Sequence, residues 1–97
     1  VHKLKEIGYE GCVSSRSQDK RADANKIDIV DMSGELPVNI QCKYTQNLPN
    51  YFDIRDACTD KDKPYCLIWK KAGKNGEQSR GTVAVIPSEY FYQLIKK

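Results

Sequence analysis

Apolar and polar residues alternate along the chain at two spacings, which predict a protein built from both helices and strands. Apolar residues three or four positions apart, with start or stop signals beside them, predict helices. These helices are expected at residues 1–7, 51–58 and 89–97. Short runs rich in β-branched and aromatic residues predict strands. The strands are expected at residues 9–14, 26–31, 38–45, 64–71 and 82–86.

The resulting order, α-β-β-β-α-β-β-α, indicates an α/β (α+β) fold. Gly8 is placed to end the first helix, and Asn50 is placed to cap the second. Pro87 and Ser88 mark the start of the last helix. We expect Tyr90 and Leu94 of that helix to face the core.

The two runs on either side of "MSGELP" are predicted to form a hairpin. A two-residue turn at residues 34–35 would close it, because Gly34 can adopt positive φ. The register then places Ile29 opposite Ile40 and Asp28 opposite Gln41. Directly opposed side chains have Cβ atoms about 5 Å apart, so two oxygen-bearing side chains there could share a cation.

Strand alternation also predicts which side chains share a face. In the first strand it places Asp28 on the face opposite Ile27 and Ile29, and in the second it places Gln41 and Lys43 together. Polar residues on one face of a hairpin are also what ordinary solvent exposure produces, and this reading stays open.

Composition limits the class of protein. The chain has 97 residues, of which 30% are charged and 39% hydrophobic, as in a single globular domain. No apolar run is long enough to span a bilayer, and no secretory signal peptide is evident, so we expect no membrane partner. Because the chain starts at Val1 rather than Met, we expect that part of its N-terminal start is missing.

Charge and cysteine content add two expectations. The net charge of +3 permits an acidic partner without requiring one, and basic residues gather in two polar segments, 16–26 and 70–80. Two solvated loops would give the same pattern. The four cysteines form no zinc motif with the single histidine. We expect Cys12, Cys42 and Cys66 to be buried thiols, and the sequence leaves a disulfide open.

Asp28 in "KIDIV" and Gln41-Cys42-Lys43 in "IQCK" together resemble the motif of the PD-(D/E)xK nuclease superfamily. The order of elements around this motif is similar to that of its Holliday junction resolvase branch, over nearly the whole chain. The resemblance implies a restriction-endonuclease-like fold, a mixed central β-sheet flanked by helices. It also implies a metal-dependent endodeoxyribonuclease.

The resemblance also assigns roles to these residues. Asp28, Gln41 and Lys43 would be catalytic. Asp28, Gln41 and the main-chain carbonyl of Cys42 would bind Mg²⁺, with Mn²⁺ as a substitute. Lys43 would orient the attacking water or stabilise negative charge on the phosphate.

Two departures from the family pattern matter for activity. Gln41 stands where an acidic residue is usual, and it brings an oxygen but no charge. The additional acidic residue of the family would precede Val1, and Glu6 and Glu10 are its nearest substitutes in this chain.

Substrate contacts are expected to go to DNA phosphates rather than to base edges. The predicted DNA-binding residues are Arg16, Ser17, Lys20, Arg21, Lys70 and Lys71. Gln46 could also contact the cut strand, although an ordinary polar strand end is the better explanation of this residue. The resemblance further implies a homodimer acting on four-way junctions in the cytoplasm of a bacterial or archaeal cell, encoded by the cell or by a phage.

Three other functions remain open from the sequence. A restriction- or repair-type nuclease could use the same scaffold. A catalytically silent nucleic-acid-binding module would account for Gln41 and for the missing upstream acid. A small intracellular scaffold protein would bind no DNA.

Overall fold

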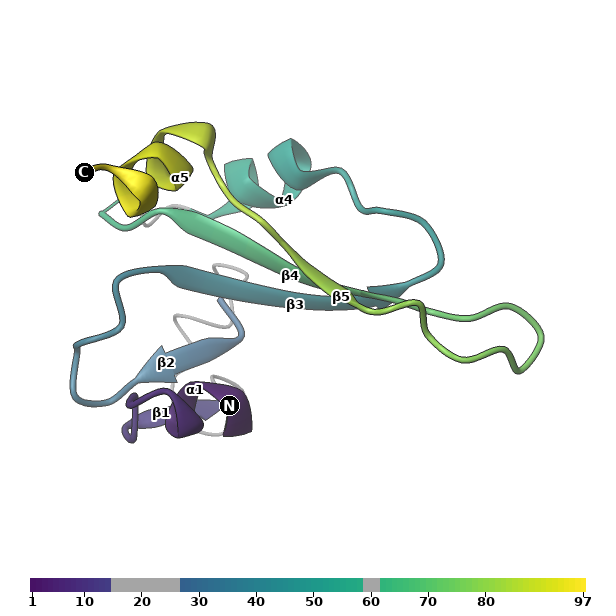
Figure 1. Ribbon diagram of the computed structural model, residues 1–97, viewed down its shortest axis with the longest axis horizontal. Coiled ribbons are helices and arrows are strands. Elements are labelled where there is room, and N and C mark those ends of the chain that lie inside the picture. Colours follow the sequence, from purple (N-terminus) through teal and green to yellow (C-terminus); the bar gives the residue numbers. More distant parts are fainter. Residues whose placement is uncertain (15–26, 59–61) are drawn as a thin grey trace.

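A computed structural model describes residues 1–14, 27–58 and 62–97 of the chain (Figure 1). Its helices are α1 (His2–Glu6), α4 (Tyr51–Ala57) and α5 (Ser88–Ile95). Its strands are β1 (Cys12–Ser14), β2 (Ile29–Asp31), β3 (Asn39–Thr45), β4 (Tyr65–Lys71) and β5 (Thr82–Val85). The prediction of a mixed sheet accompanied by helices is confirmed, whereas the nuclease type of this fold stays a prediction.

The five strands form one sheet in the order β1-β2-β3-β4-β5. β3 and β4 run parallel and pair along their whole lengths, from Asn39↔Tyr65 to Thr45↔Lys71. The other neighbouring strands are antiparallel. Because parallel neighbours need a crossover connection, α4 carries the chain from the end of β3 back to the start of β4.

Two hydrophobic clusters lie on opposite faces of the sheet. On the α4 face, the buried residues are Ile27, Cys58 and Tyr65, with Tyr51 and Ile54 of α4 packed against them. On the α1 face, the buried residues are Cys12, Ile29, Leu36 and Ile40, with Leu4 and Tyr9 among their neighbours. The core is therefore split by the sheet into two small halves.

The prediction that a two-residue turn connects β2 to β3 is wrong. β2 ends at Asp31 and β3 begins at Asn39, so seven residues join them. The Asp31 carboxylate accepts hydrogen bonds from the backbone N–H groups of Ser33, Glu35 and Leu36, and from the Ser33 hydroxyl. One side chain thus organises a loop that the prediction treated as a minimal hairpin turn.

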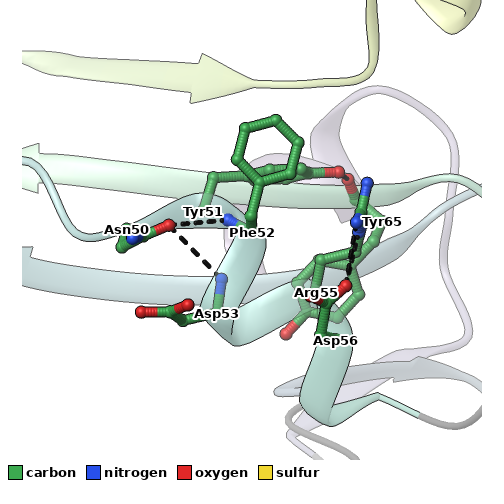
Figure 2. A network of polar contacts seen from close by, with 7 residues as sticks. All are labelled: Asn50, Tyr51, Phe52, Asp53, Arg55, Asp56 and Tyr65. Atoms are coloured by element: carbon green, nitrogen blue, oxygen red, sulfur yellow. Dashed lines mark hydrogen bonds and ion pairs between the residues drawn. The ribbon is translucent and has the colours of Figure 1, made fainter.

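Helix α4 is held at its N-terminus and by a tyrosine (Figure 2). The Asn50 side chain accepts hydrogen bonds from the backbone N–H groups of Phe52 and Asp53, at 3.1 and 3.3 Å, which confirms Asn50 as the N-cap. The Tyr51 hydroxyl donates to the backbone carbonyl of Tyr65 in β4. These contacts fix the position of α4 over the parallel strands.

Several predicted side-chain positions in the core need correction. Cys12 and Cys66 are buried as expected, but Cys42 is exposed and Cys58 is buried in its place. None of the four cysteines forms a disulfide. On α5, Tyr90 is half-buried, whereas the Leu94 side chain is 60% exposed rather than part of the core.

Across the ranges that the structure describes, no helix has the length and apolar character needed to cross a membrane.

Candidate functional site

The backbone is irregular at the start of β2, where Asp28 precedes the strand and Ile40 lies opposite. The pair Ile29↔Ile40 has the predicted register. However, the backbone N–H of Asp28 also donates to the Ile40 carbonyl, at 2.7 Å. Two residues thus oppose one, which is the arrangement of a β-bulge, and the predicted pairing of Asp28 with Gln41 is wrong.

The bulge changes which face each neighbour occupies. Ile27 packs into the cluster on the α4 face, and Ile29 packs into the cluster on the α1 face. The prediction that these two isoleucines share a face is therefore wrong. A strand of regular period 2 would keep them on one side, whereas the extra residue at the bulge shifts that period.

The Asp28 carboxylate occupies the edge of β3 that β2 leaves uncovered. Its Oδ2 accepts a hydrogen bond from the backbone N–H of Cys42, at 2.7 Å. Because strand N–H groups lie close to the plane of the sheet, this oxygen lies near that plane too. The second oxygen, Oδ1, has no hydrogen bond to any residue in the described ranges.

The main-chain carbonyl of Cys42 lies on this same edge. Odd-numbered residues of β3 direct their backbone groups to β4, as the bonds from Asn39 N to Pro64 O and from Ala72 N to Thr45 O show. The N–H and C=O of one strand residue point to the same side, so those of Cys42 point toward Asp28. The carboxylate and the carbonyl are therefore neighbours.

Gln41 and Lys43 lie together on the α4 face, as predicted. With Asp53, Ile54 and Ala57 of α4 they line a pocket of about 210 Å³. Gln41 is buried, and its Oε1 accepts a long hydrogen bond of 3.5 Å from the Tyr65 hydroxyl. The Lys43 side chain is half-buried, and no ion pair within the described parts of the chain engages its ammonium group.

The oxygen types near Cys42 are ones that a hard divalent cation takes in proteins. Within the described residues they are Asp28 Oδ1, which accepts no hydrogen bond, the Cys42 carbonyl oxygen, and Gln41 Oε1, which already accepts from Tyr65. Asp28 is not among the residues that line the pocket of Gln41 and Lys43. The set contains one carboxylate, and nowhere in the described ranges do three His, Cys, Asp or Glu side chains gather. Glu6, a predicted substitute ligand, instead pairs with His2 and Lys3 on α1.

Negative charge and burial also act on the groups around the site. Desolvation, and next the Asp28 carboxylate, raise the pKa of the Cys42 thiol. Desolvation is likewise the main reason that the pKa of Tyr65 is raised, with nearby negative charges, Asp28 among them, adding to it. Both side chains therefore stay protonated near neutral pH, and the Tyr65 hydroxyl remains a donor toward Gln41.

The predicted DNA-binding residues are divided between two parts of the chain. Arg16, Ser17, Lys20 and Arg21 lie outside the described residues. Lys70 is exposed at the end of β4, with its ammonium 5.6 Å from the centre of the Tyr44 ring. Lys71, the next residue, donates to the Gln46 carbonyl at 2.5 Å.

Sequence reasoning missed two members of this region. Asp53 lines the pocket of Gln41 and Lys43, and Tyr65 contacts Gln41. The position of Asp53 three residues after the N-cap was a usable signal, because it places the side chain in the first turn of a helix that crosses the sheet. Nothing local marked Tyr65, which reaches Gln41 through the parallel pairing of β3 with β4.

Comparisons with protein-family models, with curated proteins and with solved structures find no match for this chain.

Proposed function

We propose that the chain is a metal-dependent endodeoxyribonuclease that acts on branched DNA as a Holliday junction resolvase. One observation carries this proposal. The Asp28 carboxylate accepts from the Cys42 N–H at the edge of β3, and the residues on either side of Cys42 in this strand, Gln41 and Lys43, line a pocket on the α4 face. A carboxylate, two neutral oxygens and an ammonium group are the parts that metal-assisted phosphodiester hydrolysis uses.

The chain's own residues would divide the work as follows. Asp28 Oδ1, the Gln41 amide oxygen and the Cys42 carbonyl oxygen would hold Mg²⁺ or Mn²⁺. The cation would supply Lewis-acid stabilisation of charge on the phosphoryl group. The Lys43 ammonium would donate hydrogen bonds to a phosphate oxygen or orient the attacking water. The Asp28–Cys42 hydrogen bond would fix the carboxylate in position before substrate arrives.

The test is cleavage of a labelled four-way junction, in Mg²⁺ and in EDTA, by the wild type and by Asp28→Asn and Lys43→Met. Asp28→Asn keeps an oxygen that can accept from Cys42 N–H and removes the charge. We expect each variant to lose roughly 10²–10³-fold in rate, the usual cost of removing one electrostatic contact to a transition state. Binding of the junction in EDTA should persist.

The matched control is Lys63→Met, which removes an exposed lysine on the loop before β4 and should cleave at the wild-type rate. Undiminished cleavage by both Asp28→Asn and Lys43→Met would contradict the proposal. A linear duplex of the same sequence separates the specificities, since equal cleavage of duplex and junction favours a restriction- or repair-type nuclease.

A second candidate function is a catalytically silent nucleic-acid-binding module. The observation that favours it is the state of Gln41, which is 6% exposed and already accepts from the Tyr65 hydroxyl. A buried amide of this kind serves packing as well as it serves a cation. Junction binding without cleavage in either Mg²⁺ or Mn²⁺ would establish this function instead.

A homodimer forms part of the proposal. Large apolar side chains of α5 are exposed, among them Tyr92 at 64%, Leu94 at 60% and Ile95 at 59%. Exposed apolar groups that cluster on one helix are typical of an interaction surface. Sedimentation equilibrium that gives a monomer mass at tens of micromolar protein would remove this part of the proposal.

A further inference from the structure

We propose that the loop between β4 and β5 forms a phosphate-binding subsite, which holds the DNA backbone at a distance from the candidate cation site. The identity of the polymer as DNA rests on the proposed function. The loop extends beyond the sheet and away from α1 and α5 (Figure 1). It is thus free to meet a long ligand that also reaches the sheet.

Basic side chains surround a pocket in this loop. Its volume is about 260 Å³, and its charged lining residues are Lys71, Lys74, Arg80 and a single acid, Glu77. No ion pair found within the described residues neutralises Lys74 or Arg80. The pocket therefore carries excess positive charge, and Arg80 offers a planar group that can bind phosphate through two hydrogen bonds.

Backbone contacts hold the loop in this shape. Asn75 and Gly76 both have positive φ, of 51° and 84°, and Glu77 N donates to Lys74 O at 2.9 Å, which makes a tight turn. At Gly73 a Cβ atom would lie 1.9 Å from the Glu77 carbonyl oxygen, so only glycine allows this approach. The main chain thus fixes the backbone positions from which Lys74 and Arg80 project.

The loop pocket continues a line of cations that begins in the candidate site. The parallel register pairs Lys43 with Trp69 and Thr45 with Lys71, so Lys71 lies two residues further along the same face than Lys43. Lys71 is thus offset by about 6.6 Å along the strands and about 4.8 Å across them, which puts the two backbone positions roughly 8 Å apart. Spaced positive charges along one line suit an anion that repeats, such as a phosphodiester backbone.

The test measures binding in EDTA, so that it does not depend on cleavage. Fluorescence anisotropy with a labelled duplex compares the wild type with the double variant Lys74→Met/Arg80→Met. Loss of one phosphate contact lowers the slope of log affinity against log salt by about 0.9, which is roughly eightfold weaker binding at 0.1 M salt. We expect at least this change.

The matched control is Lys96→Met/Lys97→Met, which removes the same net charge from exposed residues at the C-terminus. It should alter the salt slope by much less. Equal losses in the two double variants, with equal thermal unfolding, would show a general charge effect and overturn the subsite. Lys74→Arg, which keeps the charge, should retain wild-type binding if the subsite is real.

Calorimetric titration with inorganic phosphate distinguishes a small anion from the polymer. Tight phosphate binding that the double variant loses, with duplex binding unchanged, would overturn the assignment to DNA. Loss of duplex binding in a protein that never cleaves DNA would leave the subsite standing while the nuclease proposal fails. If the double variant cleaves DNA at the wild-type rate and keeps the wild-type salt slope, the subsite proposal fails while the nuclease proposal stands.

Discussion

Asp28 and Asp31 lie three residues apart, and their carboxylates are used differently. The Asp31 carboxylate accepts four hydrogen bonds from its own loop, which occupy both of its oxygens. Among the residues that the structure describes, the Asp28 carboxylate accepts one hydrogen bond, from Cys42. Asp31 thus organises its own loop, whereas the described residues leave Asp28 Oδ1 without a hydrogen bond.

The hydrogen bonds to Asp31 predict a dependence of stability on pH. The Ser33 hydroxyl, and then the backbone N–H groups of the loop, hold the pKa of this carboxyl below its ordinary value of 3.8. Because the pKa is lower in the folded state, the stabilisation is present above pH 3.8 and is lost as the pH falls through the folded value.

Urea unfolding at a series of pH values checks this prediction. The difference in unfolding free energy between the wild type and Asp31→Asn should be largest above about pH 5 and should shrink in acid. Ser33→Ala, which removes only the hydroxyl donor, should give a smaller difference with the same trend. A difference independent of pH would contradict the assignment.

The buried thiols predict an order of chemical reactivity. Cys12 is 0%, Cys58 1% and Cys66 4% exposed, and burial raises the pKa of the Cys66 thiol to about 11. Desolvation and the Asp28 carboxylate raise the pKa of the Cys42 thiol too, but it is the exposed one of the four, so a thiol reagent should label it first in the native protein. Mass spectrometry of the labelled peptides would identify the site, and equal labelling of all four thiols would contradict the core described here.

At the scale of elements, α4 depends on its cap. The helix has seven residues, too few to be stable by propensity alone. Replacing Asn50 with Ala removes the acceptor for two backbone N–H groups, and we expect a loss of about 1 kcal/mol in unfolding free energy. Asn47→Ala is the control, because within the described residues Asn47 is bonded through its backbone carbonyl, which accepts from Thr45, and not through its side chain. Equal urea midpoints would contradict the prediction.

The elements that the sequence predicts well are those whose signals are local. Asn50 directly precedes α4 and caps backbone N–H groups no more than three residues away, so its signal is contained in four residues. The apolar run of β4 has the length of a buried strand. Strand ends are less accurate, since pairing partners decide them. The predicted strand at 26–31, for example, contributes only Ile29–Asp31 to the sheet.

The candidate site could be predicted only in part, because its geometry depends on distant contacts. Alternation correctly placed Gln41 and Lys43 on one face, which is a property of a single regular strand. The position of Asp28 depends on a bulge and on the hydrogen bond from the backbone N–H of Cys42, 14 positions away. The alternation of side chains along a strand reveals neither of them. The pattern thus predicted the face that Gln41 and Lys43 share but not the position of Asp28.

At the scale of the whole molecule, the sheet has a weak junction between β2 and β3. One register pair joins these strands, whereas β3 and β4 pair along their entire lengths. Leu67 in β4 is fully buried. Because local opening is easiest where few contacts must break, we expect amide hydrogens of β2 to exchange faster than those of β4.

Hydrogen exchange followed by mass spectrometry checks this expectation. Peptides that cover β4 should be protected at least tenfold more strongly than peptides that cover β2, after correction with a sample unfolded in urea. The stable part of the sheet would then be centred on β4, which pairs with β3 along its whole length. Equal protection in the two strands would show that the sheet opens as one unit.

The irregular strand around Asp28 has a consequence for how the protein would respond to a bound ion. Ile27 on one side and Ile29 on the other anchor the two halves of the interior through adjoining residues of one segment. An ion held by the intervening carboxylate would restrain both halves at once, and mass action would then favour the native chain. Melting temperature should accordingly rise with divalent ion concentration even when no DNA is present.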